Sequence, residues 1–213
     1  MLYIQIFFRT FAASIVELSN TIKMKKYIIN IIALLGVLTI AAQEHMEFKG
    51  IPMDGTSYYF ANKLMGKGYN FDTNIGNTYI LKGEFTGEDA EIFVFGTKKT
   101  GTIWKVSVFF EGAYSYSWKY LKLFYEKYVD LYITKYGTPT QHNEFFSYPY
   151  KEGDGKELEA IQKGKCFYNT FFELKDGVIC VCIMETGLTI SYEDQINSKI
   201  FEKEKEETIL DDI

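Results

Sequence analysis

The chain has 213 residues and a formal net charge of −5 at neutral pH, with acidic and basic side chains interspersed along it. Nucleic-acid binding needs a basic face, so this charge argues against a nucleic-acid partner. Aromatic residues make up 17% of the chain, a composition that favours β-rich structure.

An export signal begins at Met24, which two lysines follow. An apolar run over residues 27–40 comes next, and two alanines then precede Gln43. A charged start, a short apolar core and a small-residue cleavage site define a secretory signal. We therefore predict a signal peptide over residues 24–42 and a bacterial protein that is periplasmic or secreted.

The apolar run is shorter than the roughly 20 residues of a membrane-spanning helix, so we expect no stable membrane span after cleavage. No cysteine lies near the cleavage site, so a lipid anchor is not supported. Residues 1–23 share no pattern with the rest, and we predict that they are a mis-called N-terminal extension. The alternative is a genuine N-terminal anchor, because Leu2–Phe8 is also apolar.

The segment 48–52 (FKGIP) predicts an edge strand near the mature N-terminus. A short helix is predicted after it, because Phe60 and Leu64 stand four apart and share one helical face. Asp54 or Thr56 can cap this helix by accepting a hydrogen bond from its free N–H groups. Two glycines close behind the helix predict its end.

Three strands are predicted next, separated by glycine-bearing turns. In the last of them apolar and polar residues alternate, which is typical of a sheet with one buried side and one solvated side. The three predicted strands are Tyr79–Phe85, Glu91–Phe95 and Thr102–Phe110.

A second helix is predicted over Ser117–Tyr136, where large apolar residues recur every three or four positions and charged residues occupy the opposite face. Gly137 and Pro139 mark its end. A polar loop is predicted over Lys151–Lys163, and Asp176-Gly177 is a hairpin signal. The strands predicted in this half are Asn143–Tyr148, Cys166–Leu174, Val178–Met184 and Leu188–Tyr192.

These elements predict an α+β fold in which one domain, residues 43–192, contains two half-repeats over about 46–111 and 115–192. Each half has a helix followed by antiparallel strands, and the strands join into one sheet with both helices on one face. The other face of the sheet is then broad and open. Residues 193–213 alternate Lys and Glu and predict a polar C-terminal helix with an acidic end.

The segments FKGIPMDG, KYGTP and SYEDQIN resemble those of uncharacterised exported proteins of Bacteroidetes. The repeated plan is similar to that of beta-lactamase inhibitory protein and of small outer-membrane assembly lipoproteins. That resemblance implies protein binding through an exposed sheet face and loops. Its helix-ending Gly-x-Pro is matched at Gly137–Pro139, whereas the first half has only two glycines there, and no inhibitory contact residue carries over.

The three cysteines are Cys166, Cys180 and Cys182. Cys180 and Cys182 alternate with apolar residues and share one face of a strand, so either can reach Cys166 across a sheet. The alternative is that all three are small buried apolar side chains. No Cys-x-x-Cys pair or Cys/His cluster is present, so we predict no metal and no cofactor.

Catalytic constellations are also scarce. His142-x-Glu144 lacks a third ligand and is predicted to lie on the surface, and Gly153–Lys156 fits neither a phosphate loop nor a calcium loop. With 2 histidines, of which His45 is predicted to be disordered, a nucleophile–base pair is hardly available. We predict that the protein is not an enzyme, with a hydrolase as the least favoured alternative.

Aromatic residues at or before the helix starts form a candidate interaction surface, because Tyr and Trp supply rigid contact area at interfaces. The alternative is that they pack between helix and sheet. We predict an exported, non-enzymatic module that binds a protein partner, in the manner of an inhibitor. A domain that binds a small ligand or a glycan through surface aromatics is the alternative. The candidate surface residues are Tyr58, Tyr59, Tyr114, Tyr116 and Trp118.

Overall fold

The computed structural model describes residues 44–110 and 117–211. They belong to one compact unit that spans residues 43–213. The predicted N-terminal extension (1–23) and signal peptide (24–42) lie outside the described residues, as do Tyr114 and Tyr116.

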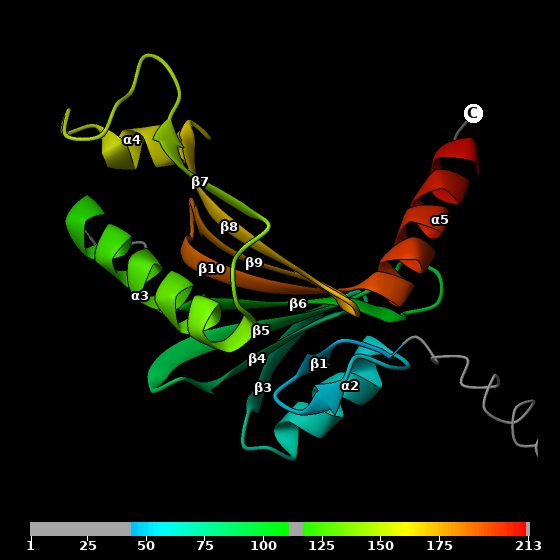
Figure 1. Ribbon diagram of the computed structural model, residues 1–213. Coiled ribbons are helices and arrows are strands. Elements are labelled where there is room, and N and C mark those ends of the chain that lie inside the picture. The colour runs from blue at the N-terminus through cyan, green and yellow to red at the C-terminus, as the bar shows by residue number, and fades with distance from the viewer. Residues whose placement is uncertain (1–43, 111–116, 212–213) are drawn as a thin grey trace, which may run out of the picture. The chain divides into compact units, whose positions relative to one another are not determined.

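An antiparallel sheet of eight strands forms the centre of the fold (Figure 1). Its order is β3-β4-β5-β6-β10-β9-β8-β7, so each half contributes four consecutive strands and the halves join where β6 pairs with β10. The joint sheet of the predicted α+β fold is therefore confirmed. The strands are β3 (Asn70–Ile75), β4 (Thr78–Phe85), β5 (Glu88–Gly96), β6 (Ile103–Phe110), β7 (Gln141–Phe146), β8 (Cys166–Leu174), β9 (Gly177–Met184) and β10 (Gly187–Asp194).

Four helices are present among the described residues: α2 (Ser57–Met65), α3 (Trp118–Tyr136), α4 (Glu157–Gln162) and α5 (Gln195–Asp211). Thr56 caps α2 and Ser117 caps α3, each by accepting a hydrogen bond from a backbone N–H in the first turn. Within the described part of the chain, none of these helices combines the length and the apolar character that crossing a membrane requires.

Helix α2 of the first half and helix α3 of the second half pack on the same face of the sheet. Val94, Val106, Tyr192 and Ile179 are cross-strand neighbours on this face, and all four are buried. Helix α2 lies over β4 and β5, and α3 lies over β9 and β10. Residues at the alternate positions are turned to the opposite side, which we call the open face. Half-buried side chains on the open face include Phe93, Phe95, Phe109, Phe171, Cys180 and Cys182.

The FKGIP segment is not an edge strand of this sheet, contrary to the prediction. It forms a separate hairpin of β1 (Glu47–Phe48) and β2 (Ile51–Pro52), which pair with each other. The ring of Phe48 packs against Phe85 and Tyr192, so the hairpin lies on the same face as α2 and α3. The reason is the Lys49-Gly50 turn, which folds the segment back on itself before it can extend along the sheet.

Two further elements were not predicted. Strand β3 occupies one edge of the sheet, and all its residues are exposed, so it carries no alternating pattern in the sequence. Helix α4 lies inside the segment predicted as a loop over Lys151–Lys163, where Ala160 and Ile161 are buried. The polar C-terminal helix is confirmed as α5.

Candidate functional site

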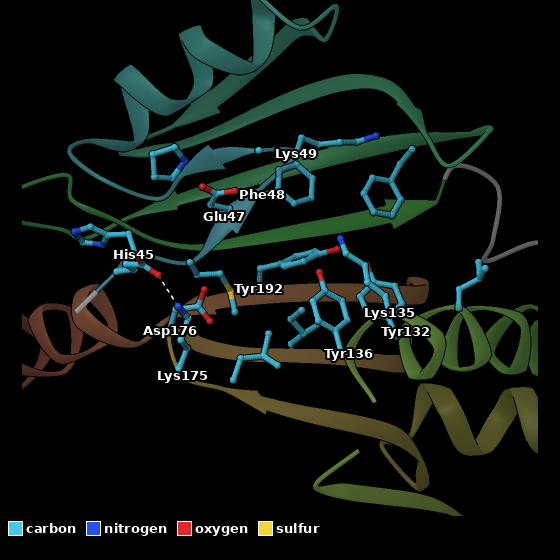
Figure 2. Close-up of a pocket in the computed structure, with 18 of the residues that line it drawn as sticks. His45, Glu47, Phe48, Lys49, Tyr132, Lys135, Tyr136, Lys175, Asp176 and Tyr192 are labelled. Atoms are coloured by element: carbon cyan, nitrogen blue, oxygen red, sulfur yellow. Dashed lines mark hydrogen bonds and ion pairs between the residues drawn. The ribbon is translucent and has the colours of Figure 1, made fainter. Parts of the chain in front are cut away.

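A cleft of about 910 Å3 opens beside the β1–β2 hairpin, on the face of the sheet that carries α2 and α3 (Figure 2). One wall is the N-terminal segment with the hairpin, and the other is the C-terminal half of α3. Phe48, Phe85, Ile179 and Tyr192 supply an apolar lining near the junction of the two half-sheets. The volume lies at the upper end of the range for small-molecule sites.

Buried polar contacts hold the N-terminal wall in place. The Asp194 carboxylate accepts a hydrogen bond from the backbone N–H of Met46 at 2.8 Å and lies 3.1 Å from Nδ1 of His45. The side-chain amide of Asn197 donates to the carbonyl of Met53 at 2.7 Å. His45, predicted to be disordered, is therefore held by a residue 149 positions away in the sequence.

Two strained turns border the cleft. Lys49 and Thr86 both have φ of 55°, and they are the only non-glycine residues with positive φ in the described segments. Each is followed by a glycine with positive φ, which gives the geometry of a type I′ hairpin turn. For a residue other than glycine, asparagine or aspartate this backbone conformation is costly. Strain that persists in folded proteins gathers at functional sites.

Three tyrosines of α3 line the opposite wall at a spacing of four residues: Tyr128, Tyr132 and Tyr136. The hydroxyls of Tyr132 and Tyr192 hydrogen-bond to each other, and both residues are buried. Burial raises the pKa of Tyr132 and of Tyr192 well above the usual value, and it raises the pKa of Tyr128 to about 12. The hydroxyls of Tyr128, Tyr132 and Tyr192 therefore stay protonated at physiological pH.

The Tyr132–Tyr192 pair carries a spare hydrogen-bond donor. Each hydroxyl has one proton, and a single hydrogen bond between the two uses only one of them. Figure 2 shows the hydroxyl of Tyr136 and the amino group of Lys135 directed toward the same central part of the cleft. The middle of the cleft therefore offers hydrogen-bond donors from tyrosine hydroxyls and from the amino group of Lys135.

Side chains of both charges lie around the cleft. The Lys49 and Lys135 amino groups lie 4.9 Å from the ring centroids of Phe85 and Tyr136, and within the described part of the chain neither forms an ion pair. The opposite end is closed by an ion pair of 2.6 Å between Lys175 and Glu44, drawn as the dashed line in Figure 2. The α3 side of the cleft thus carries the amino group of Lys135, whereas the carboxylates of Glu47 and Asp176 lie among the other lining residues.

The predicted interaction residues do not line this cleft. Tyr58 and Tyr59 are 61% and 55% exposed on α2, where the Tyr58 ring contacts Tyr79 of β4. Trp118 is partly buried against Phe146 of β7 and a tyrosine of β8, beside a smaller hollow of about 340 Å3. Because β4 and β7 lie in different halves of the sheet, the structure does not bring these three aromatics together.

The three acidic residues that line the smaller hollow, Glu126, Glu152 and Glu157, all have polar partners within it. Glu152 lies 2.6 Å from the Lys122 amino group and accepts a hydrogen bond from the Tyr168 hydroxyl at 3.0 Å. The hydrogen bond from Lys122 is the main cause that lowers the pKa of Glu152. This carboxylate is neutralised by its own neighbours.

The other sequence candidates lie apart from the cleft. His142 contacts Glu144 at 3.3 Å and Thr170 at 2.8 Å on β7, at the edge of the sheet. All three cysteines are free, and Cys166 packs toward the core whereas Cys180 and Cys182 lie on the open face, so the bridges that the sequence left open are not formed. Over residues 44–110 and 117–211, no three His, Cys, Asp or Glu side chains are grouped as metal ligands.

The sequence analysis missed the cleft because its residues come from five separated segments. One signal was present: Tyr128, Tyr132 and Tyr136 add hydroxyl groups to a stripe that we interpreted as helix-to-sheet packing. Buried tyrosine hydroxyls need partners, so three on one helical face indicate a polar interior.

No family model, no curated protein and no solved structure matches the chain. The resemblances described above stay predictions.

Proposed function

We propose that this protein is an exported, non-enzymatic binding module that takes a small carboxylate-bearing ligand with a ring-shaped apolar body in the cleft. The observation that carries the proposal is the donor-rich centre of the cleft, where the Tyr132–Tyr192 pair has a proton to donate beside Lys135. A carboxylate accepts several hydrogen bonds, and it can accept a charge-assisted one from the ammonium group of Lys135.

The apolar lining defines the rest of the ligand. Phe48, Phe85 and Tyr136 offer aromatic rings that can stack on another ring or on the C–H face of a sugar. Both a planar aromatic acid and a uronic-acid sugar have this chemistry. The volume of about 910 Å3 accommodates a ligand of drug-like size.

Binding a protein partner through the open face is the second candidate. It is favoured by the half-buried rings of Phe93, Phe95, Phe109 and Phe171, which lie on the face opposite α2 and α3. Aromatic side chains are enriched at protein interfaces. We place this candidate second because the cleft of about 910 Å3 lies on the other face of the sheet.

The test is isothermal titration calorimetry with three probes: 2-naphthoate, its neutral analogue 2-naphthamide, and a hexuronate trisaccharide. We expect one of the two acids to bind with 1:1 stoichiometry. If that acid is 2-naphthoate, we expect it to bind at least about fivefold more tightly than the amide, because an ionic hydrogen bond contributes about 1.5–3 kcal/mol. Binding of the trisaccharide instead would assign the ligand to glycans.

A pair of matched variants localises the binding. Lys135→Ala removes one of the cleft's lysines from an exposed position and is expected to weaken acid binding about fivefold or more, with unchanged thermal stability. Lys67→Ala removes an exposed lysine that does not line the cleft and should bind like the wild type. Failure of both acids to bind, or equal weakening by the two substitutions, would contradict the proposal.

A further inference from the structure

Strand β7 leaves the backbone groups on its outer side without a partner strand. It is the last strand of the eight-stranded sheet, and among the described strands it pairs only with β8 (Figure 1). The Ser147 N–H donates to the carbonyl of Lys165 in line with the β7–β8 register, so bonded and unbonded positions alternate along the strand from there. The N–H and C=O groups of His142, Glu144 and Phe146 therefore point away from β8. Such a row is a template for pairing with another strand.

The two edges of the sheet differ in their regularity. At the opposite edge, β3 has a register shift between Phe71 and Thr73, and a bulge of this kind twists an edge strand away from a new partner. Strand β7 pairs with β8 without a register shift, and its sequence QHNEFF contains no lysine or proline that would block the edge. Phe145 on this strand is 50% exposed, and its ring stacks on Phe167. The edge that can accept a further strand is therefore β7.

We propose that β7 pairs antiparallel with β7 of a second copy of this chain, about a two-fold axis at Asn143. In that register His142 of each copy lies opposite Glu144 of the other copy. Both residues direct their backbone groups outward, so each of these pairs exchanges both of its backbone hydrogen bonds. An imidazole opposite a carboxylate is also a favourable cross-strand pair of side chains. The His142-x-Glu144 motif thus serves a contact between copies.

The side chains select this register among those that a two-fold axis allows. A shift of the axis to Glu144 places two carboxylates directly opposite each other, which destabilises a sheet. A shift to His142 leaves the carboxylate opposite Thr140, without a basic partner. An axis between two residues sets an outward-facing backbone position against an inward-facing one, which antiparallel pairing excludes. A two-fold contact needs a self-complementary patch, and His142 with Glu144 supplies one.

Contacts within one copy already hold the two side chains in place. Nε2 of His142 lies 3.3 Å from the Glu144 carboxylate, and Nδ1 lies 2.8 Å from the Thr170 hydroxyl. Thr170 is buried, and its hydroxyl is hydrogen-bonded to that of Tyr125 at 2.6 Å. Side chains that are fixed before association lose less conformational entropy when they pair. None of the described residues of β7 lines the cleft, so this inference is independent of the ligand proposed there.

The first test is sedimentation velocity of the purified protein at increasing concentration. We expect a dimer whose fraction rises with concentration, because a contact through one strand of six residues is small and small interfaces are weak. A sedimentation coefficient that stays at the monomer value up to the highest concentration would overturn the proposal.

Charge variants locate the contact. Glu144→Lys sets a lysine opposite His142 of the other copy and is expected to weaken the dimer about tenfold or more, with an unchanged circular dichroism spectrum. The double variant His142→Glu with Glu144→Lys restores opposite charges and should recover the dimer. Asp72→Lys, at an exposed position on the other edge strand, is the matched control and should dimerise like the wild type. Dissociation by Asp72→Lys would indicate head-to-tail pairing of β7 with β3 and would overturn the two-fold contact.

Cysteine cross-linking tests the register. Residues at the two-fold axis have Cα atoms about 4.5 Å apart, which is within the range for disulfides. Asn143→Cys is therefore expected to form a disulfide-linked dimer on mild oxidation with oxidised glutathione. The two copies of residue 144 are roughly 8 Å apart in this register, so Glu144→Cys should not cross-link above the background of the wild type, which has three free cysteines. Cross-linking by Glu144→Cys and not by Asn143→Cys would overturn the proposed axis.

Discussion

Lys49 combines two properties that rarely occur together in one residue: it has a left-handed backbone conformation, and its cationic side chain lies on the rim of the cleft. Asparagine or glycine would suit the turn better, because a type I′ turn favours Asn-Gly at its two central positions. The lysine therefore costs stability that asparagine or glycine at this position would not. We infer that the charge is kept for the ligand.

Substitution of this residue tests that inference. Lys49→Asn is expected to leave the free energy of unfolding unchanged or to raise it by up to about 1 kcal/mol, because asparagine tolerates the left-handed conformation. The same variant should bind the acidic probe more weakly, by about threefold or more. Urea unfolding and calorimetric titration measure the two effects, and Lys49→Arg, which retains charge and strain, should bind like the wild type. Unchanged acid binding in Lys49→Asn would show that the lysine does not contact the ligand.

The Tyr132–Tyr192 pair shows why the sequence does not predict individual contacts of the site. Tyr132 and Tyr192 were placed correctly, on a helix stripe and on a strand, but their contact spans 60 positions in the sequence. The periodic spacing of apolar residues shows toward which face a side chain points, but it does not show which residue that side chain contacts. The polar function of these hydroxyls therefore became visible only when the strand order was known.

Among the elements, α3 was predictable and β3 was not, for a physical reason. Helix α3 buries one stripe and exposes the other, so its periodicity is strong. Strand β3 lies at the sheet edge with every residue exposed, and the β1–β2 hairpin is too short to carry any period. Elements that bury little leave little pattern in the sequence.

Helix α5 is attached to the sheet by a few specific contacts. The Phe201 ring stacks on Trp104 with centroids 3.9 Å apart. The buried Glu204 carboxylate accepts hydrogen bonds from the hydroxyls of Thr97 and Thr100 at 2.9 and 2.7 Å, and from the backbone N–H of Lys99 at 2.7 Å. Burial by itself would raise the pKa of Glu204, but hydrogen bonds from Thr100, Lys99 and Thr97 together lower it.

This contact makes stability depend on pH in a definite direction. Because the pKa of Glu204 is lower in the folded protein than in the unfolded chain, its contribution is present above the unfolded value of about 4.3 and is lost as the pH falls below it. Glu204→Gln is expected to cost about 1–3 kcal/mol at pH 7 and less at pH 3. Urea unfolding at the two pH values measures the difference. Glu206→Gln, on the exposed side of the same helix, is the control, and an equal loss in both variants would contradict the assigned role.

At the scale of the whole described unit, the sequence predicted the class of fold and the joint sheet, because glycine-bearing turns and apolar strand patterns mark seven of its eight strands. It did not predict the cleft, which forms where the hairpin fails to continue the sheet and instead packs beside α3. The site therefore forms where the chain departs from the repeated arrangement of a helix followed by antiparallel strands. Regular pattern reasoning finds the plan and misses such departures.

The central claim is that the cleft binds the acidic ligand. The most direct measurement is two-dimensional NMR of the backbone amides of the isotopically labelled protein. The protein is titrated with the acidic probe that bound in the calorimetric test. We predict that the largest shifts fall on residues 45–49, on Thr86, on residues 128–136 and on residues 175–176, which surround the cleft. Largest shifts on the open face, at Phe93, Phe109 or Cys180, would contradict the account.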